Sequence, residues 1–398
     1  MLISLIATTL VASLAMASSF QIQKWQDPNT GLTWIYKDSS LPKVMQVVDQ
    51  PFIELYNTGD GTILSGSTYG RLDTIDYGGG SGGLTPETLI SNVSEVLDIA
   101  QLAIRNIGGG GSADANSDRF LNISMDAHLR LCSPASDIVG AVMIHGTNTL
   151  AETVFGVDLT LNCSKPFVAT GSMRPNSAIS PDGPFNFLDA VRTAIHPEAR
   201  DRGALIAFND HLVSAFYGTK TNGNSVTTFL AMDQGYIAQF LAGQPYFFYG
   251  ASLPKARHYF DPFNLTMPLP KVVVLYGHQG FDAGLLYAAA ADGARGIVIM
   301  GVGPGGLSTA ATEAANKLFE KDVVTVASLR PFFGAVVPSP QPGNIISSGF
   351  MHGEQSRIQL QLALASGYGF NATRKLFEGE IRNAVYSPAT AYYNATSL

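Results

Sequence analysis

Cysteine, histidine clusters and charge are all scarce in this 398-residue chain, and each shortage excludes a class of protein. Only two cysteines occur, too few for a disulfide-rich scaffold. The seven histidines are scattered without His-x-His or His-Glu-x-x-His spacing, so no metal site is predicted. Charged residues make up 14% and the net charge is -7, which argues against nucleic acids and anionic membranes as partners.

Long apolar runs are also missing beyond the N-terminus. Leu2 to Leu14 is largely apolar and precedes Ala15-Met16-Ala17, a small-x-small pattern that signal peptidase accepts. The run is short for a membrane anchor, so residues 1–17 are predicted to be a cleaved signal peptide. The mature protein is then expected outside the cell or in the cell wall.

Two further features agree with export. Cys132 and Cys163 are expected to form one disulfide in an oxidising compartment, with two buried free thiols as the alternative. Six Asn-x-Ser/Thr sequons predict glycosylation. Their acceptors are Asn92, Asn122, Asn162, Asn264, Asn371 and Asn394.

Length and patterning predict two α/β domains. The chain is long for one core, and its 46% apolar content is typical of an ordered globular protein. Short apolar runs alternate with helical patterns, which indicates a mostly parallel sheet with helices on both faces. Strands are expected at 52–56, 138–144, 166–169, 204–208, 271–276, 297–300 and 323–327.

Prolines recur between residues 244 and 269 and break this alternation, so the domain boundary is placed there. Residues 18–48 are polar and are expected to form an extension wrapped on the surface. Helical spacing of apolar residues is seen from Pro86 to Ile107 and again in a final helix from Gln355 to Ala365. The predicted units are 18–48 (extension), 49–245 (N-terminal domain), 246–269 (linker) and 270–398 (C-terminal domain).

The most informative stretch is the end of the strand at 138–144. It runs into His145-Gly146-Thr147-Asn148-Thr149, which delivers small and hydroxyl side chains to the carboxyl edge of a parallel sheet, where open α/β folds bind ligands. The next strand ends in Thr170 to Pro175, and Ser172 there is expected to be structural, as is a buried His145.

Two further hydroxyl-bearing segments contain Thr58 with Thr62 and Thr219-Lys220-Thr221-Asn222. A threonine hydroxyl becomes a nucleophile when a base takes its proton, and a buried lysine can be that base. Between them lies Gly66 to Gly83, with Tyr69 and Tyr77, which is either a linker or an active-site lid. Together these residues fit acyl transfer from a small amide or ester.

These motifs resemble the bacterial-type L-asparaginases and glutaminases over about residues 52–377. The match includes His145 to Thr153, Met173-Arg174-Pro175, Asp182 to Asn186, and Thr219 to Asn222. The resemblance implies a two-domain fold with a larger N-terminal and a smaller C-terminal Rossmann-like domain. It also implies hydrolysis of a small-molecule side-chain amide without metal or cofactor, by a homotetramer or intimate dimer.

The resemblance also assigns roles to residues. Thr62 is implied as the nucleophile, activated by a lid tyrosine, Tyr77 or else Tyr69. Thr147 and Lys220 are implied to transfer protons. A looser alignment puts Ser117 and Asp118 around the substrate's α-carboxylate and α-amino groups, and Asn148 stands at a substrate-binding position of the family. Cys163 lies where some relatives have one cysteine of a disulfide, and Cys132 is near the position of its mate.

Three departures from the family pattern concern this recognition. Asn148 replaces an aspartate that receives the ammonium group, and losing a charge-assisted hydrogen bond costs on the order of 1.5–3 kcal/mol. The usual Thr-Gly-Gly-Thr is lengthened to Thr58-Gly59-Asp60-Gly61-Thr62, so either the turn absorbs an insertion or Gly59 replaces the first threonine. The loop 336–343, equivalent to one that often supplies a glutamate to a neighbouring subunit, has no acid.

Other functions remain as alternatives. Asn148 favours a catalytically impaired relative, or an amidase whose substrate lacks a free amino group. Gly301 to Gly306 formally fits the dinucleotide-binding Gly-x-Gly-x-x-Gly, but the acid expected at the end of the next strand is missing. Gly79 to Gly83 formally fits a nucleophile elbow, yet no strand precedes it.

Overall fold

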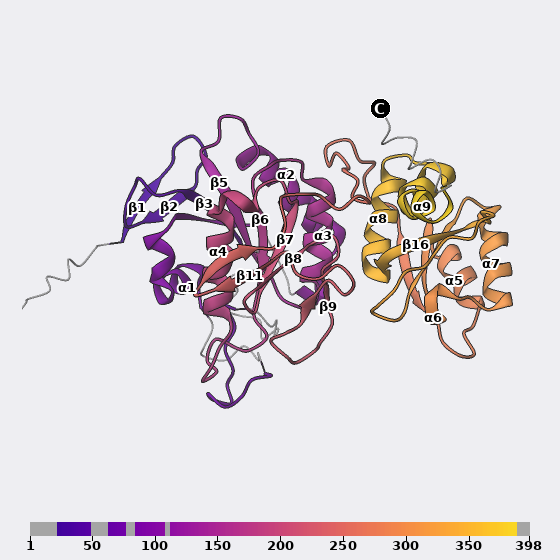
Figure 1. Cartoon of the computed structure of the whole chain (residues 1–398), viewed down its shortest axis with the longest axis horizontal. Coiled ribbons are helices and arrows are strands. Elements are labelled where there is room, and N and C mark those ends of the chain that lie inside the picture. The colour runs from indigo at the N-terminus through magenta and orange to yellow at the C-terminus, as the bar shows by residue number, and fades with distance from the viewer. Residues whose placement is uncertain (1–21, 49–62, 77–83, 108–111, 388–398) are drawn as a thin grey trace, which may run out of the picture.

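The computed structural model describes residues 22–48, 63–76, 84–107 and 112–387. The chain forms two α/β domains, a larger one at the N-terminal side and a smaller one at the C-terminal side (Figure 1). The predicted two-domain α/β fold is therefore confirmed. The predicted signal peptide at residues 1–17, the expected strand at 52–56, Thr62 and Tyr77 lie outside the described residues.

The N-terminal domain is built on a ten-stranded sheet with the order β1-β2-β4-β3-β5-β6-β7-β8-β11-β12. The strands from β4 to β7 in this order are parallel, and the pairs outside them are antiparallel. The bounds are β1 (Gln23–Gln26), β2 (Thr33–Tyr36), β3 (Lys43–Val48), β4 (Gln101–Asn106), β5 (Ile138–Ile144), β6 (Phe167–Thr170), β7 (Ala204–Phe208), β8 (His211–Ser214), β11 (Ala238–Leu241) and β12 (Gln244–Phe247), with a separate antiparallel pair β9 (Thr219–Lys220) and β10 (Phe229–Leu230).

The surface extension expected over residues 18–48 is wrong for its second half. β3 lies between β4 and β5 in the middle of the sheet, and its residues from Val44 to Val48 are fully buried. Trp34 of β2 is buried as well. Gln46 interrupts the apolar run of β3, so the segment lacks the pattern that marks a buried strand.

Helices cover both faces of this sheet. α1, η1 and α4 pack on one face, and α2 and α3 pack on the other. The helix expected from Pro86 to Ile107 is wrong beyond its first part, because Leu102 belongs to β4, where pairing with β3 overrides the helical spacing. The bounds are α1 (Pro86–Asn92), η1 (Ser94–Asp98), η2 (Ser112–Asp114), α2 (Ser117–Arg130), α3 (Leu150–Thr160), α4 (Gly183–Ile195) and η3 (Pro197–Ala199).

The C-terminal domain is a four-stranded parallel sheet with the order β13-β14-β15-β16. The first three strands and α8 were expected from the sequence. β16 contains serines and a glycine, and α9 buries few apolar residues, so neither was predicted and α8 is not the last helix. The bounds are β13 (Val272–Tyr276), α5 (Gly284–Ala291), β14 (Gly296–Gly301), α6 (Val302–Gly305), α7 (Thr309–Phe319), β15 (Val324–Leu329), β16 (Ile345–His352), α8 (Gly353–Ala365) and α9 (Phe370–Tyr386).

The two domains pack against each other through α3 and α8, which face one another across the junction (Figure 1). The predicted boundary at residue 245 falls inside β12, so the large sheet continues to Phe247. A buried ion pair, Arg257 Nε to Asp158 Oδ2 at 3.0 Å, fastens the connecting segment to α3. Among the described residues no helix is long and apolar enough to cross a membrane.

Candidate active site

The predicted site lies at the carboxyl end of β5. This strand is nearly completely buried, and the chain turns through Gly146, Thr147 and Asn148 before α3 begins at Leu150. The turn after β6 comes very close, because a Cβ atom on Gly171 would lie 2.6 Å from the His145 carbonyl oxygen. The two strand ends thus form adjacent loops at one sheet edge, as the sequence predicts.

His145 is a structural residue, as expected. Its ring is fully buried, with Nδ1 2.7 Å from the Gly146 carbonyl oxygen and Nε2 2.9 Å from the Thr153 hydroxyl. These contacts fix the turn from inside the loop. The imidazole therefore supports the position of Thr147 and is itself shielded from solvent.

Thr147 and Lys220 meet although they are far apart in the sequence. The Lys220 amine donates a hydrogen bond to the Thr147 hydroxyl at 2.9 Å. Thr147 is buried, Lys220 is half-buried, and burial lowers the pKa of the lysine amine. A larger fraction of this amine than of an exposed lysine is neutral at a given pH and so able to accept a proton, which lets the pair move a proton at the threonine oxygen.

Asn148 and Thr149 complete the loop. The Asn148 side chain is exposed, which leaves its amide free to meet a molecule from solvent. Thr149 donates to the Ser112 carbonyl oxygen at 2.6 Å, which joins the loop to η2. The Ser112 hydroxyl is buried and has no hydrogen-bond partner within the described residues. Ser112 is therefore a candidate that sequence reasoning missed, and the preceding glycine run is its only sequence signal.

Ser117 and Asp118, the pair expected to bind substrate, occupy a different setting. The Ser117 hydroxyl donates to Gln361 of α8, and Arg357 of the same helix lies 3.4 Å from it. Asp118 is exposed in the first turn of α2, where Asn116 caps the helix. Within the described residues Ser117 serves the domain junction, and Ser112 contacts the Thr147 loop instead.

The turn after β6 is structural around Ser172. The buried Ser172 hydroxyl donates to the Arg174 carbonyl oxygen at 2.9 Å, and Asp182 accepts the backbone N–H groups of Met173 and Arg174. Ile63, the residue after Thr62, packs at this turn, since a Cβ on Gly183 would lie 3.0 Å from it. Ile63, the first described residue after Thr62, therefore lies at the same edge of the sheet.

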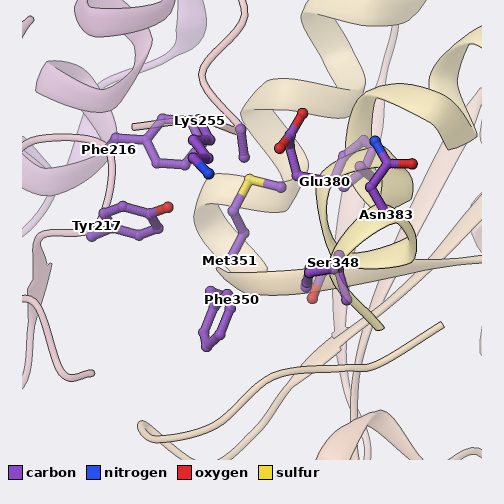
Figure 2. A pocket seen from close by; sticks show the side chains of 13 residues that line it. Phe216, Tyr217, Lys255, Ser348, Phe350, Met351, Glu380 and Asn383 are labelled. Carbon is purple, nitrogen blue, oxygen red and sulfur yellow. The ribbon is translucent and has the colours of Figure 1, made fainter. Parts of the chain in front are cut away.

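A hollow lies between the two domains, lined on the N-terminal side by Phe216 and Tyr217 (Figure 2). Its volume is about 230 Å³, and its walls are mainly apolar, with Phe216, Tyr217, Phe350 and Met351 among the lining residues. Phe216 and Tyr217 come just before β9. Nothing in the predicted chemistry uses this hollow, and within the described residues no group of three His, Cys, Asp or Glu side chains could hold a metal ion.

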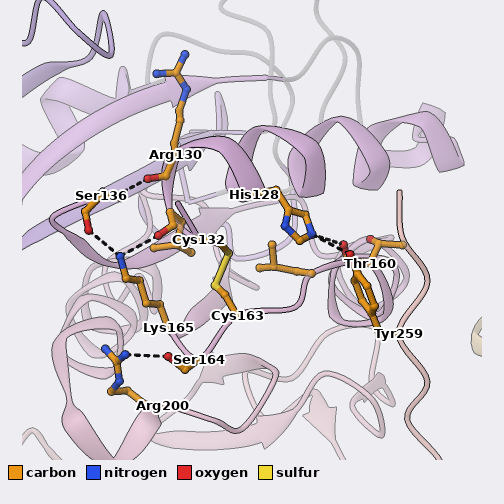
Figure 3. The surroundings of a disulfide bond; sticks show 12 residues. His128, Arg130, Cys132, Ser136, Thr160, Cys163, Ser164, Lys165, Arg200 and Tyr259 are labelled. Atoms are coloured by element: carbon orange, nitrogen blue, oxygen red, sulfur yellow. Dashed lines mark hydrogen bonds between the residues drawn. A yellow bond between two sulfur atoms is a disulfide. The ribbon is translucent and has the colours of Figure 1, made fainter. Parts of the chain in front are cut away.

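The predicted disulfide is present. Cys132 and Cys163 are bonded, with Cα atoms 5.5 Å apart, and join the end of α2 to the loop between α3 and β6 (Figure 3). Lys165 donates to the Leu131 and Ser136 carbonyl oxygens at 2.9 and 3.0 Å on one side of the bridge. The disulfide lies at the end of α3 remote from Thr147 and is a structural element.

Sequence comparison decides the family. The chain matches the family described as "Asparaginase, N-terminal" over residues 53–252 and "Glutaminase/Asparaginase C-terminal domain" over residues 271–377. It belongs to the asparaginase family. The expectation of an amide hydrolase is thereby confirmed, and the nucleotide-dependent alternative based on Gly301 to Gly306 is left without support.

Individual relatives of this asparaginase-family member cover most of its length. L-asparaginase 2-3 of Saccharomyces cerevisiae is 38% identical over 348 residues, which is 86% of this chain and 91% of that protein. L-asparaginase 2 of Bacillus subtilis is 36% identical over 319 residues, 79% of this chain and 83% of its own. The crystal structure of a probable cytoplasmic L-asparaginase from Campylobacter jejuni superposes with a TM-score of 0.75 at 27% identity, covering 84% of this chain and 99% of the other.

Proposed function

We propose that this protein is a secreted L-asparaginase that hydrolyses the side-chain amide of asparagine, with glutamine as a second substrate. The observation that carries the proposal is the 2.9 Å hydrogen bond between Lys220 and Thr147 at the carboxyl end of β5. It places a proton-transfer pair where an α/β sheet binds its ligand. Relatives named L-asparaginase, aligned over most of their length, support the choice of substrate.

The proposed mechanism has two displacements. Thr62, whose proton passes to Tyr77, attacks the amide carbon, and the tetrahedral oxyanion is stabilised by backbone N–H groups of the loop turns. The C–N bond then breaks, the nitrogen takes up a proton, and ammonia leaves an acyl ester on Thr62. Thr62 and Tyr77 lie outside the described residues, so their roles rest on the family resemblance.

The second displacement uses the described pair. A water molecule gives its proton to the Thr147–Lys220 pair, attacks the ester carbon, and releases the acid while Thr62 regains its proton. The lowered pKa of Lys220 supports this role, because a larger fraction of the amine is neutral at working pH. No step requires a metal or a cofactor.

Ammonia release from a panel of small amides tests the proposal. Thr62→Ala, Thr147→Ala and Lys220→Met should each reduce kcat by at least about 100-fold, since each removes a proton-transfer or nucleophilic group. Thr309→Ala, an exposed threonine of α7, is the matched control and should behave as wild type. Retention of most activity by Thr147→Ala would remove the proposed mechanism.

Asn148 supports a second candidate function. This exposed amide stands where the family has a carboxylate, which suits a substrate that carries no ammonium group or a protein of reduced activity. The substitution Asn148→Asp separates the two proposals. If wild type hydrolyses asparagine rapidly, the second proposal is rejected; if only the Asn148→Asp variant turns over, it replaces the first.

Export and glycosylation are part of the proposal. The disulfide supports an oxidising compartment. The five described sequon asparagines are all exposed, which supports their access to the glycosylation machinery; they are Asn92, Asn122, Asn162, Asn264 and Asn371. Asn394 lies outside the described residues. Expression with the native N-terminus should yield cell-free protein whose mass falls on deglycosylation, and retention inside the cell without glycans would oppose this.

A homotetramer or intimate dimer is proposed as the working assembly. Large apolar side chains are exposed after β15, notably Phe333 and Val337, and such residues are common at subunit interfaces. Light scattering coupled to gel filtration should give two or four times the mass of the chain. A monomer with full activity would contradict this part of the proposal.

A further inference from the structure

The first turn of α8, in the C-terminal domain, binds the segment that leads into Lys220. Glu354 accepts a hydrogen bond from the Thr219 hydroxyl at 2.8 Å. The adjacent Gln355, almost completely buried, donates from Nε2 to the Phe216 carbonyl oxygen at 3.0 Å. Two neighbouring side chains of one helix therefore anchor both the backbone and a side chain of residues 216–219.

The next turn of α8 reaches the segment that follows Thr147. Arg357 donates to Glu152 of α3 at 3.2 Å, and α3 begins three residues after Thr147. The same helix thus contacts both chain segments that the Lys220–Thr147 hydrogen bond joins. Figure 1 shows α8 at the edge of its domain that faces α3.

We propose that Glu354 is a positioning residue that, through Thr219, sets the place of the Lys220 amine against Thr147. This inference rests on the proposed function of the Thr147–Lys220 pair. Successive residues of a strand point to opposite faces, so anchoring Thr219 on one face fixes the backbone from which Lys220 projects on the other. Lysine has a long flexible stem, and within the described residues Lys220 has no ion-pair partner to hold it.

Loosening this contact should affect proton transfer more than substrate binding. A displaced Lys220 loses its alignment with the Thr147 hydroxyl, and misplacement by about 1 Å can cost on the order of 100-fold in rate. The amine also becomes better hydrated, so its pKa rises toward the ordinary lysine value. The rising limb of the kcat–pH profile should therefore move to higher pH while KM stays within about twofold.

The test compares Glu354→Ala with Glu354→Gln and Thr219→Val with Thr219→Ser, assayed as the full chain by ammonia release from pH 6 to 10. We expect kcat to fall by about 10-fold or more in Glu354→Ala and in Thr219→Val, and the rising limb of the kcat–pH profile to move to higher pH in both. The double variant should show no further fall in kcat, because both changes break the same contact. Glu354→Gln keeps an acceptor oxygen and Thr219→Ser keeps a donor hydroxyl, so both variants should retain most of the wild-type rate. Unchanged kcat and pH profile in Glu354→Ala would overturn the inference.

A control and a second readout separate this inference from the proposed function. Glu313→Ala removes an exposed carboxylate from α7 of the same domain and should leave kcat and the pH profile unchanged. Hydrogen exchange needs no activity: amides of residues 216–221 should exchange faster in Glu354→Ala than in wild type. If wild type releases no ammonia, the proposed function fails, and faster exchange still supports the anchor, whereas equal exchange overturns it.

Discussion

Asp189 in α4 is a buried carboxylate whose titration should control the stability of the N-terminal domain. Its side chain is 2% exposed, and neither of its oxygens has a hydrogen-bond partner in the described part of the chain. Arg192 lies 3.6 Å away, too far for a hydrogen bond. Burial, with repulsion from Asp210, raises the pKa of Asp189 to about 7, and the attraction of Arg192 only partly opposes this.

The sign of the pH effect follows from the two pKa values. In the unfolded chain the pKa is near 3.8, so between about pH 4 and pH 7 the folded protein holds a proton that the unfolded chain has released. Stability from this group therefore falls as pH rises through that window and is level above pH 7. The two pKa values differ by about three pH units, which corresponds to at most about 4 kcal/mol.

Asp189→Asn removes this titration and should therefore regain the stability that wild type loses as pH rises from about 4 to 7. The difference in free energy of unfolding, variant minus wild type, should increase from pH 4.5 to pH 7, favour the variant above pH 7 by up to about 4 kcal/mol, and then stay constant. Urea unfolding followed by tryptophan fluorescence is suited to this, because Trp25 and Trp34 both lie in the N-terminal domain.

The matched control is Asp201→Asn, which removes the same charge from an exposed turn of the same domain. Its difference from wild type should stay within about 0.5 kcal/mol at every pH, as is usual for surface changes. A difference for Asp189→Asn that is flat across pH 4.5 to 8.5, or one that falls with pH, would refute the reasoning that Asp189 is held protonated by burial.

Three other predictions follow from named contacts. Replacing Cys132 and Cys163 together by serine opens a loop of 31 residues and should cost about 3.7 kcal/mol of stability while kcat is unchanged; equal urea midpoints for variant and wild type would contradict this. Arg257→Met leaves the Asp158 carboxylate buried without its partner and should cost about 3–5 kcal/mol, most of which Asp158→Asn should recover in the double variant, and an additive loss would argue against the pair. In Lys220→Met the rising limb of the kcat–pH profile should disappear, and its persistence would assign that limb to another group.

Local patterns predicted the strands whose residues are continuously apolar. β5, β7 and β14 carry no polar side chain, and each was expected within a few residues. β15 was expected as well, although it contains Thr325 and Ser328. β3 was not expected, although it lies at the centre of the large sheet, because Gln46 interrupts its pattern. β4 was taken for helix because Leu102 also fits helical spacing, and only its pairing with β3 decides between the two.

Within the site, the sequence predicted the threonine and the lysine that meet, but not the neighbouring residues that hold them in place. The threonine and lysine motifs were sufficient to expect Thr147 and Lys220 at one place. Ser112 was missed because a lone serine after glycines carries no pattern, and its importance appears only when Thr149 bonds to its carbonyl oxygen. Glu354 was missed as well, because its partner Thr219 is 135 residues away and no local pattern links the two.

The sequence by itself determined the fold class and the family, because these depend on residue types at fixed local spacing. The tertiary structure alone decided that a helix of the C-terminal domain holds the segment before Lys220, and that Asp189 is buried beside another carboxylate. Such contacts depend on which distant side chains the packed strands and helices bring within a few ångströms, and no local pattern records that.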